Sequence, residues 1–134
     1  MRRIADTGLL AAFFDRLDPH HDWAVEQFAR FSPFHICEAV LTEVAYLVDN
    51  PSLGLRMLVR GDLVIDFLLE RQKERVLELL EKYSGRMDLA DACIVAMTEQ
   101  EDRCQVWTVD ETDFTIYRRH GRQRIPCAFP PKPY

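Results

Sequence analysis

The stretch from Met87 to Met97, MDLADACIVAM, constrains the fold more than any other part of the chain. Past its first turn it carries apolar side chains on nearly every side, which is typical of a helix enclosed by the rest of the fold. Its two acids, Asp88 and Asp91, are three residues apart and therefore lie on one face of that helix. We expect both carboxylates to face a cleft with protein walls.

A second interpretation of these two acids stays open. An Asp that opens a helix, followed by another acid three residues later, also forms an ordinary N-terminal cap, because the first carboxylate accepts a backbone N–H and both charges favour the helix dipole. Asp88 and Asp91 alone do not decide between a cap and a site. The positions of the other acids have to be considered with them.

Strand patterns and helix patterns alternate along the chain. Short apolar runs predict strands at residues 2–6, 34–41, 63–69 and 105–109, and an edge strand at 125–129. Helical spacing and capping residues predict helices at 9–17, 19–31, 43–48, 53–60, 72–83, 88–97 and 113–120. The alternation predicts one α/β domain over residues 1–134, with three layers in which helices cover both faces of a central parallel sheet of four to five strands.

Acidic residues follow the predicted strands. Asp6 ends the first predicted strand, Asp110 directly follows the fourth, and Glu43 is placed at a strand-to-helix junction with Thr42 as the helix N-cap. Ligands gather at the carboxyl ends of parallel strands, near the point where the strand order reverses. We therefore expect Asp6, Glu43 and Asp110 to meet the acids of the buried helix at one edge of the sheet.

Such a group of acids predicts a bound divalent cation. Neighbouring carboxylates repel one another, and no Lys or Arg adjoins them in the sequence to balance their charge. Oxygen ligands without His or Cys suit Mg²⁺ or Mn²⁺ better than Zn²⁺. A hydrated metal held in this way can activate water and stabilise charge on a phosphate, which predicts hydrolysis of a phosphodiester.

The acidic composition is compatible with a polyanionic substrate. The formal net charge is −5, and setting aside Asp113 and the five acids already named leaves +1 for the remainder.

No apolar run approaches the roughly 18 residues that cross a membrane, and no signal-peptide pattern follows Met1, so we expect a cytoplasmic protein without a membrane partner. The four isolated cysteines predict free thiols and no structural zinc.

Four motifs in this order resemble those of the PIN domain family, and most closely the VapC-type ribonuclease toxins of prokaryotic toxin–antitoxin pairs. They are Asp6-Thr7-Gly8, Leu41-Thr42-Glu43-Val44, Asp88-x-x-Asp91-Ala92 and Thr108-x-Asp110-x-x-Asp113-Phe114, and they span essentially the whole chain. The chain departs from the family pattern at Trp107, where a small hydroxyl residue is common, and at Val109, where a second Thr is common. Neither departure removes an acid.

The resemblance implies a metal-dependent endoribonuclease that leaves a 3′-hydroxyl and a 5′-phosphate. It implies catalytic and metal-binding roles for Asp6, Glu43, Asp91 and Asp110, an accessory metal-binding role for Asp88, and supporting hydroxyls from Thr7 and Thr108. Asp113 is expected to cap the last helix. The implied partners are an RNA substrate, a cognate antitoxin and a second copy of the chain, with Leu9, Leu10, Phe13 and Phe14 contributing either to the core or to such an interface.

A basic cluster near the C-terminus has two interpretations. The cluster consists of Arg118, Arg119, Arg122 and Arg124 and is flanked by Tyr117 and His120. Arg118, Arg119 and Arg122 could contact the RNA backbone, or the cluster could be a solvated helix end. We regard both as open.

Other functional classes fit the sequence less well. A receiver-like signalling module would need an adjacent acidic pair after the first strand and a Lys after the last, but the only lysines are Lys73, Lys82 and Lys132. A haloacid-type phosphatase would need an Asp where Gly8 stands. A catalytically inactive PIN fold that binds RNA or protein remains the main alternative.

Overall fold

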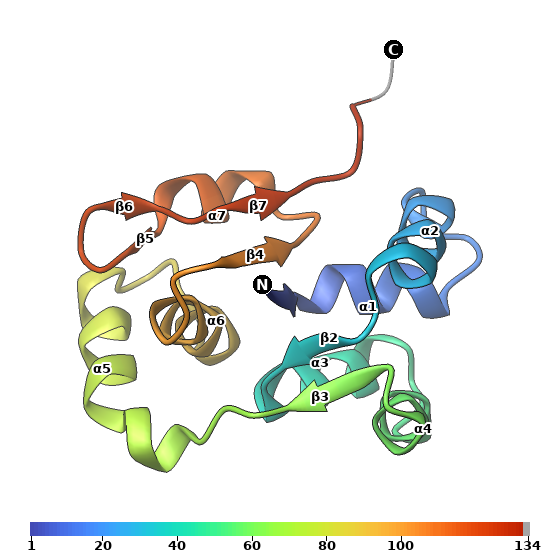
Figure 1. Cartoon of the computed structure of the whole chain (residues 1–134), viewed down its shortest axis with the longest axis horizontal. Coiled ribbons are helices and arrows are strands. Elements are labelled where there is room, and N and C mark those ends of the chain that lie inside the picture. Colours follow the sequence, from blue (N-terminus) through green and yellow to red (C-terminus); the bar gives the residue numbers. More distant parts are fainter. Residues whose placement is uncertain (133–134) are drawn as a thin grey trace.

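The computed structural model describes residues 1–132 and has alternating strands and helices (Figure 1). The strands are β1 (Arg2–Ala5), β2 (Phe34–Ile36), β3 (Leu63–Ile65), β4 (Cys104–Trp107), β5 (Arg118–Arg119), β6 (Gln123–Arg124) and β7 (Cys127–Ala128). The helices are α1 (Thr7–Phe14), α2 (His21–Phe31), α3 (Glu38–Leu47), α4 (Ser52–Arg60), α5 (Leu69–Lys82), α6 (Leu89–Glu99) and α7 (Glu111–Ile116).

A five-stranded parallel sheet with the order β3-β2-β1-β4-β7 forms the centre of the fold. The chain moves outward from β1 to β3 through α1–α4, and then crosses back to β4 through α5 and α6. Because parallel crossovers share one hand, this reversal puts the two groups of helices on opposite faces of the sheet. Figure 1 shows α5 and α6 on one side and α1 and α2 on the other. The predicted three-layer α/β/α architecture is confirmed.

The reversal in strand order lies between β1 and β4, at the centre of the sheet. Strand β1 is hydrogen-bonded to β2 on one side and to β4 on the other, with Ile4 level with His35 and Val106. The carboxyl ends of β1 and β4 therefore lie side by side, where a parallel sheet leaves a crevice for ligands.

Helix α6 is the most enclosed helix of the described chain, as its apolar sequence predicts. Ala90 and every residue from Ala92 to Thr98 are buried. The helix packs against α5 and contacts β1, β4 and α3. This burial fixes the direction from which Asp88 and Asp91 approach the sheet.

The sequence-based boundary at Glu43 was wrong. Strand β2 ends at Ile36 and α3 begins at Glu38, so Glu43 lies in the second turn of α3 and not at a strand-to-helix junction. Thr42 does not cap the helix, because its hydroxyl donates to the carbonyl of Glu38 one turn earlier. The apolar residues Val40 and Leu41 fit the face of a helix as well as a strand, which explains the error.

The C-terminal part also differs from the prediction. A helix was expected at 113–120, but α7 ends at Ile116, and the chain continues into the antiparallel hairpin of β5 and β6. His120 and Gly121 both have positive φ, as a tight hairpin turn requires. The edge strand expected at 125–129 is present as the two-residue β7, which pairs with β4.

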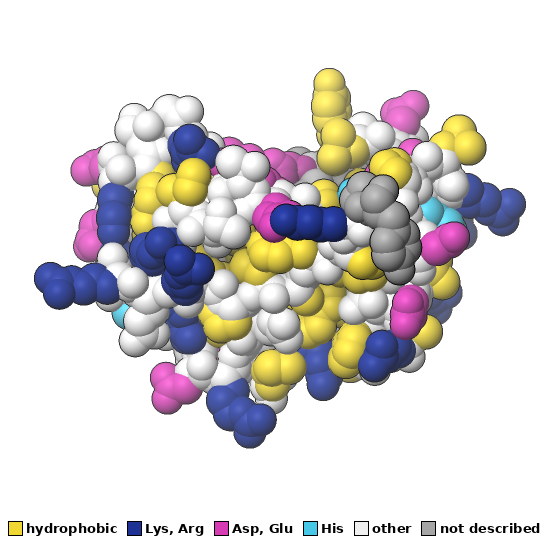
Figure 2. Space-filling view, turned by 90° about the horizontal axis from the view of Figure 1, so that it is seen from above, with side chains coloured by type: hydrophobic (Ala, Val, Ile, Leu, Met, Phe, Trp, Pro, Cys, Tyr) yellow, Lys and Arg dark blue, Asp and Glu magenta, His cyan; other side chains and the backbone are white. Residues whose placement is uncertain are grey.

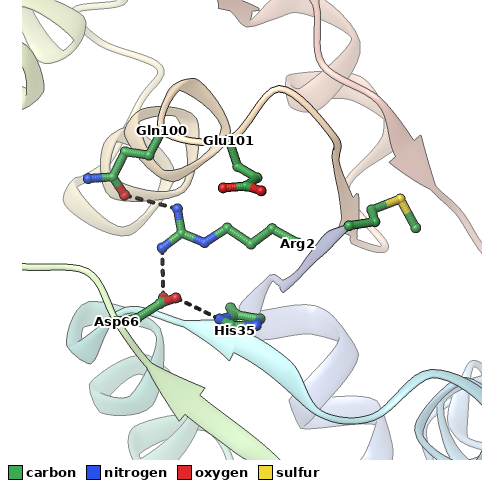
Figure 3. Close-up of a pocket in the computed structure, with 6 residues that line it drawn as sticks. Arg2, His35, Asp66, Gln100 and Glu101 are labelled. Atoms are coloured by element: carbon green, nitrogen blue, oxygen red, sulfur yellow. Dashed lines mark hydrogen bonds and ion pairs between the residues drawn. The ribbon is translucent and has the colours of Figure 1, made fainter.

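A buried arginine connects three elements on the face of the sheet that α6 covers. Arg2 donates to the carbonyl of Met97 and the side chain of Gln100, both at 2.9 Å, and to Asp66 at 2.6 Å. Asp66 also contacts His35, and Figure 3 shows Arg2 lying between Gln100 and Asp66. Arg2 thereby connects β1 to α6 and to the segment after β3.

Within residues 1–132, no helix has the length and apolar character needed to span a membrane.

Candidate active site

Asp6 lies at the carboxyl end of β1 and is 7% exposed. Its Oδ1 accepts the backbone N–H of Thr7 at 2.8 Å, which caps α1, and its Oδ2 accepts the hydroxyl of Thr108 at 2.7 Å. Thr108 is fully buried at the end of β4, and its hydroxyl also accepts the backbone N–H of Asp110 at 2.9 Å. One threonine thus joins the two acids that follow the central strands.

A second threonine fixes Glu43. The hydroxyl of Thr7 in the first turn of α1 donates to Oε1 of Glu43 on α3 at 2.6 Å. Glu43 also lies close enough to Asp88, at the start of α6, for the two carboxyls to share a hydrogen bond when one is protonated. Glu43 therefore connects the β1 side of the site with the N-terminus of α6.

Both interpretations of the Asp88–Asp91 spacing apply, because one acid caps the helix and the other faces the acid cluster. Asp88 is the N-cap of α6, because its Oδ1 accepts the backbone N–H of Asp91 at 2.8 Å. Asp91 is partly buried, and its Oδ2 accepts the hydroxyl of Tyr117 at 2.8 Å. The cap orients the first turn of α6, and that orientation leaves the Asp91 carboxylate facing the other acids.

Asp110, not Asp113, caps the last helix. Its Oδ1 accepts the backbone N–H of Asp113 at 2.9 Å, so the expected capping role belongs to the residue three positions earlier. The Asp113 carboxylate pairs with Arg86 at 2.7 Å. Asp113 is therefore charge-compensated at the margin of the site.

Gly8 allows α1 to approach the end of β4. A Cβ atom at this position would lie 2.3 Å from Cγ2 of Val109, far inside van der Waals contact. Because Val109 stands between Thr108 and Asp110, the absence of a side chain at Gly8 lets the first turn of α1 meet the acid-bearing loop directly.

The pKa values of four acids of the site, Asp6, Glu43, Asp91 and Asp110, are raised above those of ordinary carboxyls. Burial raises the pKa of Asp6 to about 6, against the hydrogen bonds from Thr108 and Thr7 that lower it. Burial also raises the pKa of Asp91 to about 7, and the nearby charges of Asp88, Asp6 and Asp110 raise it further. Desolvation likewise raises the pKa of Glu43 and of Asp110. The acids thus influence one another electrostatically.

Within the described chain, neither Lys nor Arg forms an ion pair with Asp6, Glu43, Asp88, Asp91 or Asp110. The four desolvated carboxylates of this set, Asp6, Glu43, Asp91 and Asp110, are of a kind that a nearby cation stabilises. The oxygen-only donor set therefore fits a hard divalent metal.

The side-chain positions limit how many acids can bind one ion directly. Among residues 1–132, no three His, Cys, Asp or Glu side chains lie close enough together to hold a metal ion. Mg²⁺ commonly binds through one or two carboxylates and keeps several waters. Direct ligation by part of the acid set, with water completing the shell, is compatible with this arrangement.

Tyr117 is the residue of the site that the sequence did not indicate. Its side chain is fully buried, and its ring packs edge-on against Tyr83 and Phe114. The sequence placed Tyr117 within a helix, whereas it follows α7 and turns back toward α6. Its only sequence signal was an aromatic residue beside the basic cluster.

The basic residues near the C-terminus differ in accessibility. The buried guanidinium of Arg119 donates to the carbonyls of Thr98, Glu101 and Asp102, and Arg118 donates to three carbonyls at the end of α7. Arg122 and Arg124 are exposed on the hairpin. Figure 2 shows Lys and Arg side chains at the left, the side on which Figure 1 places this hairpin.

The early apolar residues also have defined positions. Leu9 and Leu10 are buried in the core, and Phe13 and Phe14 are partly buried beside it. Leu9 and Leu10 therefore belong to the folded interior and are not available to a partner.

Comparison with known proteins gives two findings. A family model described as PIN domain matches residues 3–119 of the chain. The structure is similar to the crystal structure of VapC20 from Mycobacterium tuberculosis, described as a sarcin–ricin loop cleaving toxin, with a TM-score of 0.71 and 18% sequence identity, covering 82% of this chain and 91% of that chain. No curated protein matches the chain in sequence.

Proposed function

The chain belongs to the PIN domain family, and from this we propose that it is a metal-dependent endoribonuclease, the toxin of a toxin–antitoxin pair. The observation that carries the proposal is the gathering of uncompensated, desolvated carboxylates at the carboxyl ends of β1 and β4. Asp6 and Asp110 come from these strand ends, Glu43 from α3 and Asp91 from α6, and the exposed Asp88 at the start of α6 adjoins them. A site of this composition is suited to divalent-metal chemistry on a phosphodiester.

In this proposal Asp6, Glu43, Asp91 and Asp110 are the catalytic acids, and Asp88 is an accessory metal ligand. Mg²⁺ or Mn²⁺ would supply a bound water of lowered pKa and positive charge near the phosphate oxygens. Thr108 and Thr7 act through the carboxylates, because their hydroxyls fix the Asp6 and Glu43 side chains. The cleaved strand would carry a 3′-hydroxyl and a 5′-phosphate.

The proposed RNA contact lies on the β5–β6 hairpin. Arg122 is exposed there, Arg124 is exposed opposite Arg118, and Arg118 is partly buried. Positive side chains at these positions can neutralise RNA phosphates. Arg119 is left out of this contact because its side chain is buried, with its guanidinium against the carbonyls of Thr98, Glu101 and Asp102.

We further propose a cognate antitoxin and a second copy of the chain as protein partners. Large apolar side chains are exposed on α3 and α4, where Tyr46, Leu47 and Val59 are 85%, 60% and 87% exposed. Exposed apolar side chains that cluster on one region support an interaction with another protein. A chain of this family is expected to act in the cytoplasm.

The test is cleavage of a pool of structured RNAs by the purified protein in Mg²⁺, in Mn²⁺ and in chelator. A sarcin–ricin loop RNA is included because that loop is the target in the description of VapC20. Asp91→Asn is the inactive variant, and Asp22→Asn, at an exposed position of α2, is the matched control. Discrete cuts that require metal, persist in the control and vanish in Asp91→Asn are expected.

The opposite result would change the functional class. If the wild type and Asp91→Asn were equally silent in every metal, a PIN scaffold that binds RNA or protein without cleaving it would be the better description. Cuts that are equal in both proteins would indicate a contaminating nuclease.

A further inference from the structure

Two cysteines that are distant in sequence meet beside the acid cluster. Cys37 is the N-cap of α3, Cys93 lies in the second turn of α6, and both side chains line one cavity where these two helices are in contact. Both are free and 2% exposed. Two reduced sulfur atoms from α3 and α6 therefore lie at the same cavity.

A half-open cavity gives small molecules access to this pair. The cavity has a volume of about 390 Å³, and both cysteines line it. Much of the remaining wall is apolar and includes Phe67, Leu68 and Leu89, while Glu38 and Glu70 also line it. A small neutral molecule fits these surroundings better than a bulky anion such as glutathione, because the acidic side chains repel negative charge.

The local backbone favours Cys37 as the more reactive sulfur. The contact with Cys93 lowers the pKa of the Cys37 thiol, and hydrogen bonds from backbone N–H groups at the start of α3 lower it further, against the effect of burial. Thiolates at helix N-termini are stabilised in this way, and the thiolate is the form that reacts with oxidants. Cys93 is then the neighbouring thiol that can complete a bridge.

We propose that Cys37 and Cys93 are a site of reversible oxidation by hydroperoxides, which converts the two thiols into an intramolecular disulfide. In the first step the Cys37 thiolate attacks the peroxide, the O–O bond breaks, and a sulfenic acid forms while hydroxide or alkoxide leaves. In the second step the Cys93 sulfur attacks the sulfenic acid, and the S–S bond forms with loss of water. The peroxide accepts two electrons in total, and a dithiol reductant restores both thiols.

The remaining cysteines provide internal controls. The Cys104 thiol is buried and donates to the carbonyl of Thr98, and the Cys127 thiol donates to the carbonyl of Ile125. Neither lines the cavity of the pair. A variant carrying Cys104→Ser and Cys127→Ser keeps the proposed site and removes the other two thiols.

The test is treatment of the reduced protein with hydrogen peroxide, followed by thiol counting and peptide mapping by mass spectrometry. The expected result is loss of two of the four thiols, a Cys37–Cys93 cross-linked peptide, and recovery of four thiols in dithiothreitol. The Cys104→Ser, Cys127→Ser variant should form the same bridge. In Cys93→Ser, a dimedone adduct at Cys37 should accumulate instead.

Three outcomes would overturn the proposal. These are retention of all four thiols under peroxide that fully oxidises free cysteine, a bridge that includes Cys104 or Cys127 or joins two molecules, and a sulfinic acid at Cys37 without a bridge. Circular dichroism of Cys93→Ser checks its fold, and the wild-type peptide map decides the question even if that variant does not fold. Because the readout is a covalent bond, the result is independent of RNA cleavage.

Discussion

Tyr117 donates its hydroxyl to Oδ2 of Asp91 at 2.8 Å from a ring that is fully buried. This hydrogen bond lowers the pKa of Asp91, in opposition to the burial and the neighbouring acids that raise it to about 7. The hydroxyl therefore favours the charged form of the carboxylate and fixes its orientation. A residue outside the family motifs thus supports one of the proposed catalytic acids.

Tyr117→Phe should weaken cleavage more than folding. The ring and its packing remain, but the hydrogen bond to a charged group, worth about 1.5–3 kcal/mol, is lost. We expect a roughly tenfold lower kcat/KM at neutral pH and a rate profile displaced to higher pH. The measurement is the pH dependence of cleavage. A uniform loss at all pH values, with an equally large loss of stability, would contradict this role.

The metal-free protein should become less stable as the pH rises from 4 to 7. The pKa of Asp6 is about 6 in the folded protein and 3.8 in the reference state, so the folded state binds the proton more tightly between these values. The stabilisation is present below pH 4 and is lost as the pH rises through about 6. The raised pKa of Asp91 extends the same trend to about 7.

Asp6→Asn should flatten this pH dependence. The variant cannot ionise at position 6, so at pH 8 we expect metal-free Asp6→Asn to be more stable than wild type by about 1–3 kcal/mol. Urea denaturation in chelator at pH 4.5 and pH 8 measures how the free energy of unfolding changes with pH in the wild type and in Asp6→Asn. Asp22→Asn is the control and should retain the wild-type slope. Equal slopes in all three proteins would exclude Asp6 as the source.

Mn²⁺ should stabilise the wild type and bind more tightly at higher pH. Binding to the folded state raises the apparent stability, and the raised pKa values mean that protons compete with the metal. We expect the Tm to rise with Mn²⁺ at pH 8, with a smaller rise at pH 6. Asp6→Asn should lose most of this shift, whereas Asp22→Asn should keep it. A shift unaffected by Asp6→Asn would place the bound ion elsewhere.

Gly8→Ala should destabilise the fold through one contact. The new Cβ would meet Val109, and overpacking of this kind costs about 1–3 kcal/mol. Val109→Ala removes the obstructing methyl groups, so the double variant should recover much of the loss caused by Gly8→Ala. A double-mutant cycle by urea denaturation measures the coupling. Additive losses would show that the contact does not cause the effect.

Arg122→Gln and Arg119→Gln should affect different properties. Arg122 is exposed, so its neutralisation should weaken RNA binding and reduce the salt dependence by about one unit of slope without affecting folding. Arg119 is buried against backbone carbonyls, so its replacement should lower stability. Each substitution is made in the inactive Asp91→Asn protein. RNA-binding titrations then measure affinity, and melting curves measure stability. A stable Arg119→Gln protein with weakened RNA binding would reverse the assignment.

The alternation of apolar runs was sufficient to predict the sheet and its helical layers. It was also sufficient to place Asp6 and Asp110 at the ends of β1 and β4, because Asp6 directly follows Ala5 and Asp110 comes three residues after Trp107. The helix at Met87–Met97 was recognisable since its apolar character extends to every face. These features depend on local periodicity, which a single sequence contains.

Other features depend on contacts between distant residues. The boundary at Glu43 was misplaced because Val40 and Leu41 are apolar side chains compatible with either a strand or a helix, and the pairing of β2 with β3 ends at Ile36. The Tyr117–Asp91 hydrogen bond requires the chain to leave α7 and return to α6, which no local pattern predicts. The contact between Cys37 and Cys93 likewise exists only once the layers are assembled.

The order of the acids along the chain has a consequence for synthesis. Asp6 emerges first from the ribosome, but its neighbour across the sheet, Thr108, and the Tyr117 hydroxyl that orients Asp91 come from the last quarter of the sequence. A nascent chain that has not yet delivered β4 contains no complete site, because β4 occupies the centre of the sheet beside β1. Any activity of this site is therefore withheld during translation until the segment from β4 to Tyr117 has been made.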